Sequence, residues 1–69
     1  MRQIELATLM GLYLTGSHET DHGYIKQTYL FGECEFQSDY HRTEEDCEDE
    51  VAREFFREIE EMMHRHMTS

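Results

Sequence analysis

Carboxylates are the residues of this chain whose number and spacing could do chemistry. Six of the seven residues from position 44 to position 50 are acidic, and four more acids follow by position 61. On a helix over residues 43–67, with a rise of about 1.5 Å per residue, these ten acids give roughly one carboxylate per 3.7 Å of axis. One strand of B-DNA carries one phosphate per about 3.4 Å. This density predicts a surface that pairs with Lys and Arg of another protein.

The predicted partner-binding residues are the acids of this run, together with three acids that precede it. They are Glu44, Glu45, Asp46, Glu48, Asp49, Glu50, Glu54, Glu58 and Glu61, flanked by Glu33, Glu35 and Asp39. Acids four positions apart on a helix, such as Glu44 and Glu48, repel by about 0.2–0.5 kcal/mol. This repulsion favours a binding role, because a solubilising surface does not need it. An ordinary solvated face is the alternative, since acids near a helix N-terminus are favourable.

Histidine and cysteine provide the other candidates for chemistry. His18 and His22 have the four-residue offset of metal-ligand pairs, but the HETDH order differs from that of the HExxH zinc motif. Loop or surface histidines are the simpler interpretation, so no metal or cofactor is predicted. Ser17 beside His18, or Cys34 with His41, could be drawn as nucleophile and base, but neither pair has an orienting third group. We therefore expect no enzyme.

One long helix is predicted to carry the acidic run. Residues 43–67 contain no Gly or Pro, and Thr43 with Asp46 three residues later nearly matches a capping box. Apolar side chains recur at steps of three and four. The resulting stripe comprises Cys47, Val51, Phe55, Ile59, Met62 and His66, widened by Ala52, Phe56 and Met63. We expect this stripe to pack against the rest of the chain.

The N-terminal residues are open to two interpretations. Apolar residues alternate from Ile4 to Leu14, which indicates a strand with one strongly apolar face. Leu, Ala and Met are also good helix formers, so residues 4–10 could instead begin a helix. Residues 15–23 are rich in turn-forming types and include two Gly, which predicts a loop.

Two further segments complete the expected fold. Residues 24–31 are rich in β-branched and aromatic types between two Gly and predict a strand. Residues 33–37 alternate apolar and acidic types. This pattern indicates either a third short strand or a continuation of the preceding strand past a bulge at Gly32. The predicted fold class is α+β: an antiparallel β-hairpin or three-stranded sheet followed by one long C-terminal helix packed on one face. This arrangement is expected to bury every apolar stripe.

Length and charge limit the function classes. The chain has 69 residues, with 16 Asp and Glu against 6 Lys and Arg, and a formal charge of −10. We expect one small domain over residues 1–69, with a β-rich region over 1–42 and the helix over 43–67. Direct nucleic-acid binding is disfavoured by repulsion from phosphates. No segment approaches the roughly 18 apolar residues of a membrane span, and the N-terminus lacks signal-peptide features, so a cytoplasmic location is expected.

Cysteine and aromatic usage add two expectations about packing. Cys34 and Cys47 are predicted to be free thiols that serve as small core residues. One helix and a small sheet cannot fully bury eight aromatic side chains. Some Tyr are therefore expected at the surface, where Tyr is a favoured interface residue.

In size and charge, this acidic chain with a carboxylate-rich helix resembles inhibitor proteins of phages and mobile elements, many of which are DNA mimics. Such proteins include anti-restriction and anti-CRISPR proteins and inhibitors of gyrase, uracil glycosylase or RNA polymerase. The resemblance implies that the acids stand in for phosphates and occupy the basic nucleic-acid-binding surface of a host protein, in the host cytoplasm. Two alternatives stay open: a self-associating homodimer built on the apolar stripe and the tyrosines, and a small metal-binding protein.

Overall fold

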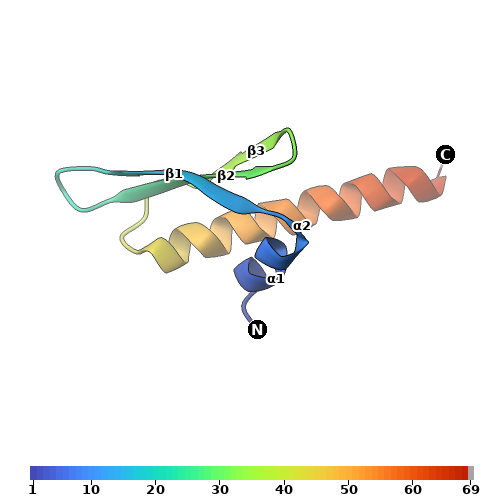
Figure 1. Cartoon of the computed structure of the whole chain (residues 1–69), viewed down its shortest axis with the longest axis horizontal. Coiled ribbons are helices and arrows are strands. Elements are labelled where there is room, and N and C mark those ends of the chain that lie inside the picture. The colour runs from blue at the N-terminus through green and yellow to red at the C-terminus, as the bar shows by residue number, and fades with distance from the viewer. Residues whose placement is uncertain (69) are drawn as a thin grey trace.

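The computed structural model describes residues 1–68, which form a three-stranded antiparallel sheet with a long helix across one face (Figure 1). A short N-terminal helix lies beside the long one. In chain order the elements are α1 (Gln3–Met10), β1 (Tyr13–Glu19), β2 (Ile25–Phe31), β3 (Cys34–Gln37) and α2 (Glu44–Thr68). The strands are arranged in sequence order, so β2 is central. The predicted α+β class, with three strands followed by a long C-terminal helix, is confirmed.

The long helix α2 begins as the sequence predicts. The Thr43 side-chain hydroxyl accepts a hydrogen bond from the backbone N–H of Asp46 at 3.1 Å, which satisfies one of the free N–H groups of the first turn. The apolar stripe then faces the sheet and α1, and Cys47, Val51 and Phe55 are fully buried along it. Capping and burial of one stripe together fix the start and the rotation of this helix.

Phe55 lies at the centre of the aromatic core. Its ring makes edge-to-face contacts with Phe31 of β2 at 5.0 Å, Phe36 of β3 at 5.8 Å and Phe56 of its own helix at 5.2 Å, measured between ring centroids. Contacts of this geometry stabilise aromatic pairs beyond the area that they bury. One side chain therefore joins α2 to the two strands beneath it.

The polar groups that β2 places under α2 are satisfied locally. The buried Tyr29 hydroxyl donates a hydrogen bond to the Gln27 side-chain carbonyl at 3.0 Å. The Ser38 hydroxyl accepts one from the Gln27 backbone N–H at 2.9 Å. Burial, with a smaller contribution from the nearby charge of Glu48, raises the pKa of Tyr29 to about 12. The phenol therefore stays neutral in the folded protein at physiological pH.

The predicted strand over the first residues is wrong, because Gln3–Met10 form helix α1, as the helical alternative predicted. Ile4 and Ala7 are both buried, whereas a strand would place residues three apart on opposite faces. Gly11, with a φ of 121°, ends the helix, and the N–H of Leu12 then bonds back to the carbonyl of Ala7 at 3.0 Å. The alternation of apolar residues before Leu12 therefore does not correspond to a strand.

The predicted loop over residues 15–23 is wrong at its start, because β1 continues to Glu19. After an irregularity at Thr15, the strand pairs with β2 from Thr28 back to Ile25. Every residue of β1 is exposed, and this end of the hairpin extends past the first turn of α2 (Figure 1). With solvent on both faces, the strand needs no apolar alternation, so polar turn-forming residues are accommodated by backbone pairing alone.

Several apolar side chains remain exposed, so the expectation that every apolar stripe is buried is wrong. The last turns of α2 run beyond the end of the sheet (Figure 1), which leaves Met62 60% and Met63 59% exposed. Leu9 of α1 is 75% exposed. Cys34 lies exposed on the edge strand β3, contrary to its predicted place in the core, whereas Cys47 is buried as predicted.

Candidate functional site

The acidic residues of α2 are divided between two flanks of the helix, because the core-facing stripe runs between them. Residues three and four apart share a helix face. One flank faces α1, and we call its acids the α1-side group; the other faces β3, and we call its acids the β3-side row. The α1-side group comprises Glu45, Glu48 and Asp49, and the β3-side row comprises Glu50, Glu54, Glu58 and Glu61. Glu44 and Asp46 are exposed in the first turn, outside both sets.

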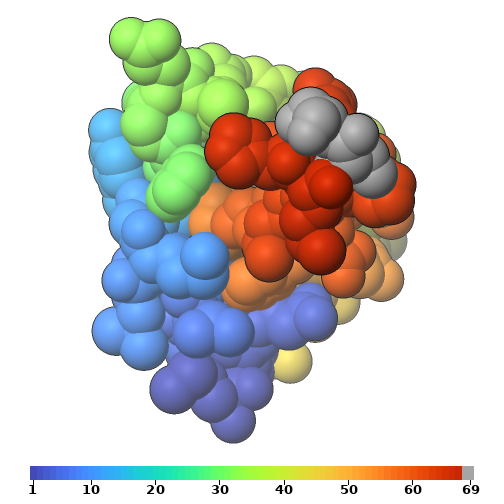
Figure 2. All heavy atoms as spheres, turned by 90° about the vertical axis from the view of Figure 1, so that its right-hand side faces the viewer, coloured from blue at the N-terminus to red at the C-terminus, as the bar shows by residue number. Residues whose placement is uncertain are grey.

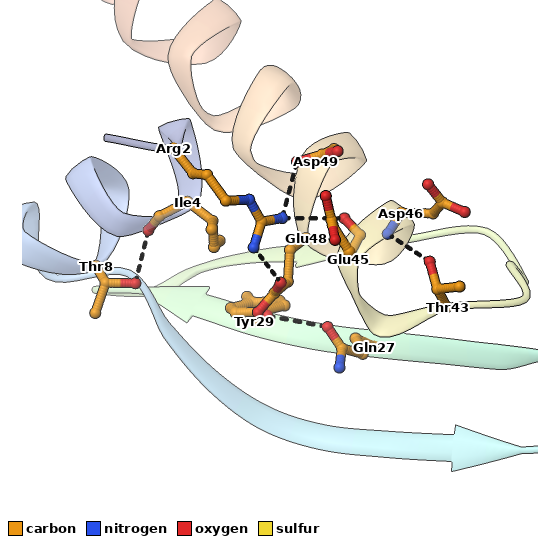
Figure 3. A network of polar contacts seen from close by, with 10 residues as sticks. All are labelled: Arg2, Ile4, Thr8, Gln27, Tyr29, Thr43, Glu45, Asp46, Glu48 and Asp49. Atoms are coloured by element: carbon orange, nitrogen blue, oxygen red, sulfur yellow. Dashed lines mark hydrogen bonds and ion pairs between the residues drawn. The ribbon is translucent and has the colours of Figure 1, made fainter.

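The α1-side group is held by an arginine from the start of the chain (Figure 3). The Arg2 guanidinium lies 3.1 Å from a carboxylate oxygen of Glu48 and 3.0 Å from one of Asp49. It also donates to the backbone carbonyl of Glu45 at 3.4 Å. The hydrogen bond with Asp49, supported by that with Glu48, raises the pKa of Arg2. The carboxylates of Glu48 and Asp49 are therefore engaged within the chain, and the sequence does not predict this because they lie more than 40 positions from Arg2.

We expect Arg2→Gln to lower the thermal unfolding midpoint at low ionic strength and to have a much smaller effect at high salt. The attraction between exposed charges weakens as the Debye length falls from about 30 Å at 0.01 M salt to about 3 Å, the length of these ion pairs, at 1 M salt. Circular dichroism melts at two salt concentrations measure this difference. Arg53→Gln is the matched control, because Arg53 makes no ion pair within residues 1–68. Equal losses for the two variants at both salt concentrations would contradict the anchoring role of Arg2.

The β3-side row contains two carboxylates without an ion-pair partner among the described residues. Glu54 and Glu58 are exposed, and within residues 1–68 neither forms an ion pair. Glu61 lies 3.7 Å from Arg65 in an exposed pair four residues apart, a type that contributes little to stability. Glu54 and Glu58 are therefore open to a partner, although Arg53 and Arg57 line a shallow hollow together with Glu50 and Glu54.

Glu50 starts the row and is tied to the chain that leads into α2. One of its carboxylate oxygens lies 2.6 Å from the His41 ring and accepts the backbone N–H of Asp39 at 3.0 Å. Partial burial acts to raise the pKa of Glu50, but these two hydrogen bonds, together with the charges of His41 and Arg53, outweigh it and hold the pKa below its ordinary value. Glu50 therefore positions the 38–42 connection, and it is less available to a partner than Glu54.

The lowered pKa of Glu50 predicts a specific pH dependence. A carboxyl whose pKa is lower in the folded state stabilises the fold fully above its ordinary pKa of 4.5, and that contribution is lost as pH falls through the folded pKa. We therefore expect the difference in unfolding free energy between the wild type and Glu50→Gln, measured by urea unfolding, to shrink as pH falls below 4.5. Glu60→Gln, at an exposed position, is expected to show a smaller and flatter difference. A Glu50→Gln difference that stays constant into acid would refute the assignment.

The three predicted flanking acids have different places. Glu35 lies on β3 and accepts a hydrogen bond from the side-chain amide of Gln37 at 2.5 Å. The backbone of Asp39 binds Glu50, and its side chain is exposed next to the start of the row. Asp39 thus lies beside the start of the β3-side row, whereas the Glu35 side chain lies with that of Gln37 on the face of β3 opposite Phe36, and Glu33 is exposed in the turn between β2 and β3.

An open groove of about 640 Å³ lies between β3 and the outer part of α2. Its apolar lining comes from Phe31, Cys34, Phe36, Phe55, Ile59 and Met62, and the carboxylate-bearing Glu35, Glu54 and Glu58 also line it. Figure 2 views the molecule from this end, where the last turns of α2 lie beside the turn between β2 and β3. Sequence analysis missed the groove, because it arises from how far the helix extends past the strands.

The remaining candidates are not gathered into a site. His18 lies on β1 with its ring edge-on to Tyr40 at 6.2 Å, and His22 is in the hairpin turn. Across residues 1–68, no three His, Cys, Asp or Glu side chains are arranged to hold a metal ion. Tyr13, Tyr24 and Tyr40 are exposed, as expected for part of the tyrosine set.

Comparison with known proteins gives no relative to reason from. No family model matches the chain, and neither a curated protein nor a solved structure was found to match it. Neither α1 nor the described part of α2 has the combination of length and apolar character needed to cross a membrane.

Proposed function

We propose that this chain is a non-catalytic acidic inhibitor that occupies the basic nucleic-acid-binding surface of another protein. The observation that carries the proposal is the β3-side row, in which Glu54 and Glu58 are exposed and without ion pairs among the described residues. The formal charge of −10 adds a long-range field of the same sign. A protein that grips phosphates with Lys and Arg would therefore be attracted to this flank of α2.

The spacing of the row suits groups that bind phosphates. Glu50, Glu54 and Glu58 follow one another at intervals of four residues, which is about 6 Å along the helix axis. Alternate phosphates of one DNA strand are about 6.8 Å apart along the duplex axis. Each carboxylate can accept two parallel hydrogen bonds from an Arg guanidinium, as a phosphate can. The row thus offers charge at about half the linear density of one strand.

The proposal has consequences for binding kinetics and origin. Charge steering makes association fast and strongly dependent on ionic strength. A small acidic binder of this type fits the inhibitors of phages and mobile elements, acting in the cytoplasm of the host where the target works. Anti-CRISPR and anti-restriction proteins and inhibitors of gyrase or polymerase are the kinds of activity that we would test first.

The proposal is tested by capture on the immobilised chain from a bacterial lysate at low salt, with bound proteins identified by mass spectrometry. We expect the retained proteins to be basic nucleic-acid-binding proteins that high salt or added duplex DNA releases. A resin carrying an unrelated protein of similar negative charge serves as the control for simple ion exchange. Identical protein sets on the two resins would contradict a specific inhibitor.

Self-association is the second candidate, and a separate observation favours it. Apolar side chains are exposed on α1 and at the start of β1, which follow one another in the chain: Leu6, Leu9, Met10, Tyr13 and Leu14. Patches of exposed apolar residues mark interaction surfaces when they are contiguous. Light scattering across a range of salt concentrations discriminates the candidates, because a dimer through this patch would persist at high salt.

A further inference from the structure

The groove between β3 and α2 combines an apolar floor with an acidic margin. Phe55 and Phe36 belong to the aromatic core, and the outer wall is made by Ile59 and the largely exposed Met62. Glu54 and Glu58 line the same groove from α2. An occupant that satisfies both features must carry apolar side chains with cationic groups beside them.

The α2 side of the groove has the form of a helix-packing surface. Its lining residues Glu54, Phe55, Glu58, Ile59 and Met62 recur at steps of one, three and four, which is one face of a helix over two turns, or about 12 Å. Recognition of an amphipathic helix in an apolar groove uses anchors of matching spacing. A helix lying along α2 would therefore cover this wall.

A second copy of the chain does not complement the groove. A two-fold dimer through this surface would bring the carboxylates of both copies into one interface. Glu54 and Glu58 lack ion-pair partners within residues 1–68, and each copy carries a formal charge of −10. Like-charge juxtaposition at an interface is strongly unfavourable. Charge complementarity therefore selects a basic occupant.

We infer that the groove receives a basic amphipathic helix of the target protein, with its apolar side chains against Ile59 and Met62 and its Lys or Arg against Glu54 and Glu58. This inference rests on the proposed function and specifies the partner surface that it requires. It assigns binding energy to apolar contact as well as to charge. The complex should therefore keep part of its affinity in salt that screens exposed ion pairs.

Cys34 allows occupancy to be measured on the unmodified protein. This thiol is exposed and lines the groove, whereas Cys47 is buried. The probe is a synthetic peptide of about three helical turns, with Leu at every third and fourth position and Lys elsewhere. The control peptide has Ser in place of each Leu and the same charge. We expect the Leu–Lys peptide to bind about tenfold more tightly than the Ser–Lys peptide and to slow alkylation of Cys34, as followed by mass spectrometry.

Two neighbouring methionines provide matched variants. Met62 lines the groove and Met63 does not, although their exposed fractions, 60% and 59%, are nearly equal. Because both side chains are largely exposed, either change to Gln should leave the fold intact, which circular dichroism verifies. We expect Met62→Gln to weaken binding of the Leu–Lys peptide about fivefold and Met63→Gln to leave it unchanged.

The outcomes separate this inference from the proposed function. Equal binding of the two peptides, or equal loss in the two methionine variants, would overturn the groove as the helix site while leaving the acidic surface in place. Failure of both peptides to bind at low salt would count against the acidic surface as well. Dimerisation of the chain that protects Cys34 without any peptide would overturn the inference in favour of a second copy.

Discussion

Phe55→Ala is expected to unfold most of the protein at room temperature. Phe55 is fully buried and its ring contacts Phe31, Phe36 and Phe56. Truncating a core Phe to Ala costs about 3–5 kcal/mol, and a single core in a chain of this length rarely supplies more than about 3–5 kcal/mol. Urea unfolding followed by circular dichroism measures the loss.

Met63→Ala is the control for that experiment, because Met63 lies on the same helix and is largely exposed. Its unfolding free energy should stay within about 0.5 kcal/mol of the wild-type value. If Phe55→Ala also stayed within about 1 kcal/mol of the wild type, α2 could not pack on the sheet through this side chain. The layer arrangement that positions the β3-side row would then be wrong.

Neutralising the outer β3-side row is expected to weaken capture of a target about a hundredfold. The variant Glu54→Gln, Glu58→Gln, Glu61→Gln removes three carboxylates but keeps side chains of similar size and good helix propensity. If each charged contact contributes about 1 kcal/mol at a partly exposed interface, the three together give this change in affinity. Titration of each variant against a captured and purified target measures the effect.

The α1-side group provides a matched control for this experiment. Glu45→Gln, Glu48→Gln, Asp49→Asn removes the same number of charges from the same helix, but two of these carboxylates are already paired with Arg2. We expect the affinity of this variant to fall by less than about tenfold, compared with about a hundredfold for the row variant. Equal losses would show that only net charge matters and that the β3-side row is not the binding surface.

The row variant is expected to lose affinity for the target without losing stability. Glu54 and Glu58 are four residues apart, and neutral side chains remove their mutual repulsion of about 0.2–0.5 kcal/mol. The row variant should therefore be at least as stable as the wild type in thermal melts. A row variant that unfolds would mean that these carboxylates support the fold rather than a partner.

The sequence was sufficient to predict α2, because several independent signals agreed. Thr43 caps the helix, and the spacing of Cys47, Val51 and Phe55 matches one face. The strand near residues 25–31 was likewise predicted from its β-branched and aromatic residues, and the strand near residues 34–37 was one of two interpretations of its alternating apolar and acidic residues. Where a local preference and burial of one stripe point to the same element, the pattern is informative.

The failures arose where tertiary position decided the outcome. The residues from Ile4 to Met10 fit a strand pattern and a helix composition equally well, and only packing against α2 selects the helix. Residues 15–19 form a strand although their types favour a loop, because β2 provides the backbone partner. Tertiary pairing of this kind commonly overrides propensity.

The candidate site was predictable in composition but not in arrangement. Counting acids identified α2 as the charged element, and helical spacing alone could have separated the flanks. That Arg2 engages Glu48 and Asp49, while Glu54 and Glu58 have no ion pair in the described part of the chain, depends on where α1 packs. The groove depends on the extension of α2 past the sheet and had no signal in the sequence.

The most direct test of the central claim is competition between this chain and duplex DNA for one purified target. If the β3-side row occupies the surface that grips phosphates, the chain and DNA must exclude each other. The apparent dissociation constant for DNA, followed by fluorescence anisotropy, should then rise in proportion to added chain, without a limit. The row variant should produce this rise only at about a hundredfold higher concentration. A ternary complex of target, DNA and chain, with DNA affinity unchanged at saturation, would contradict the account.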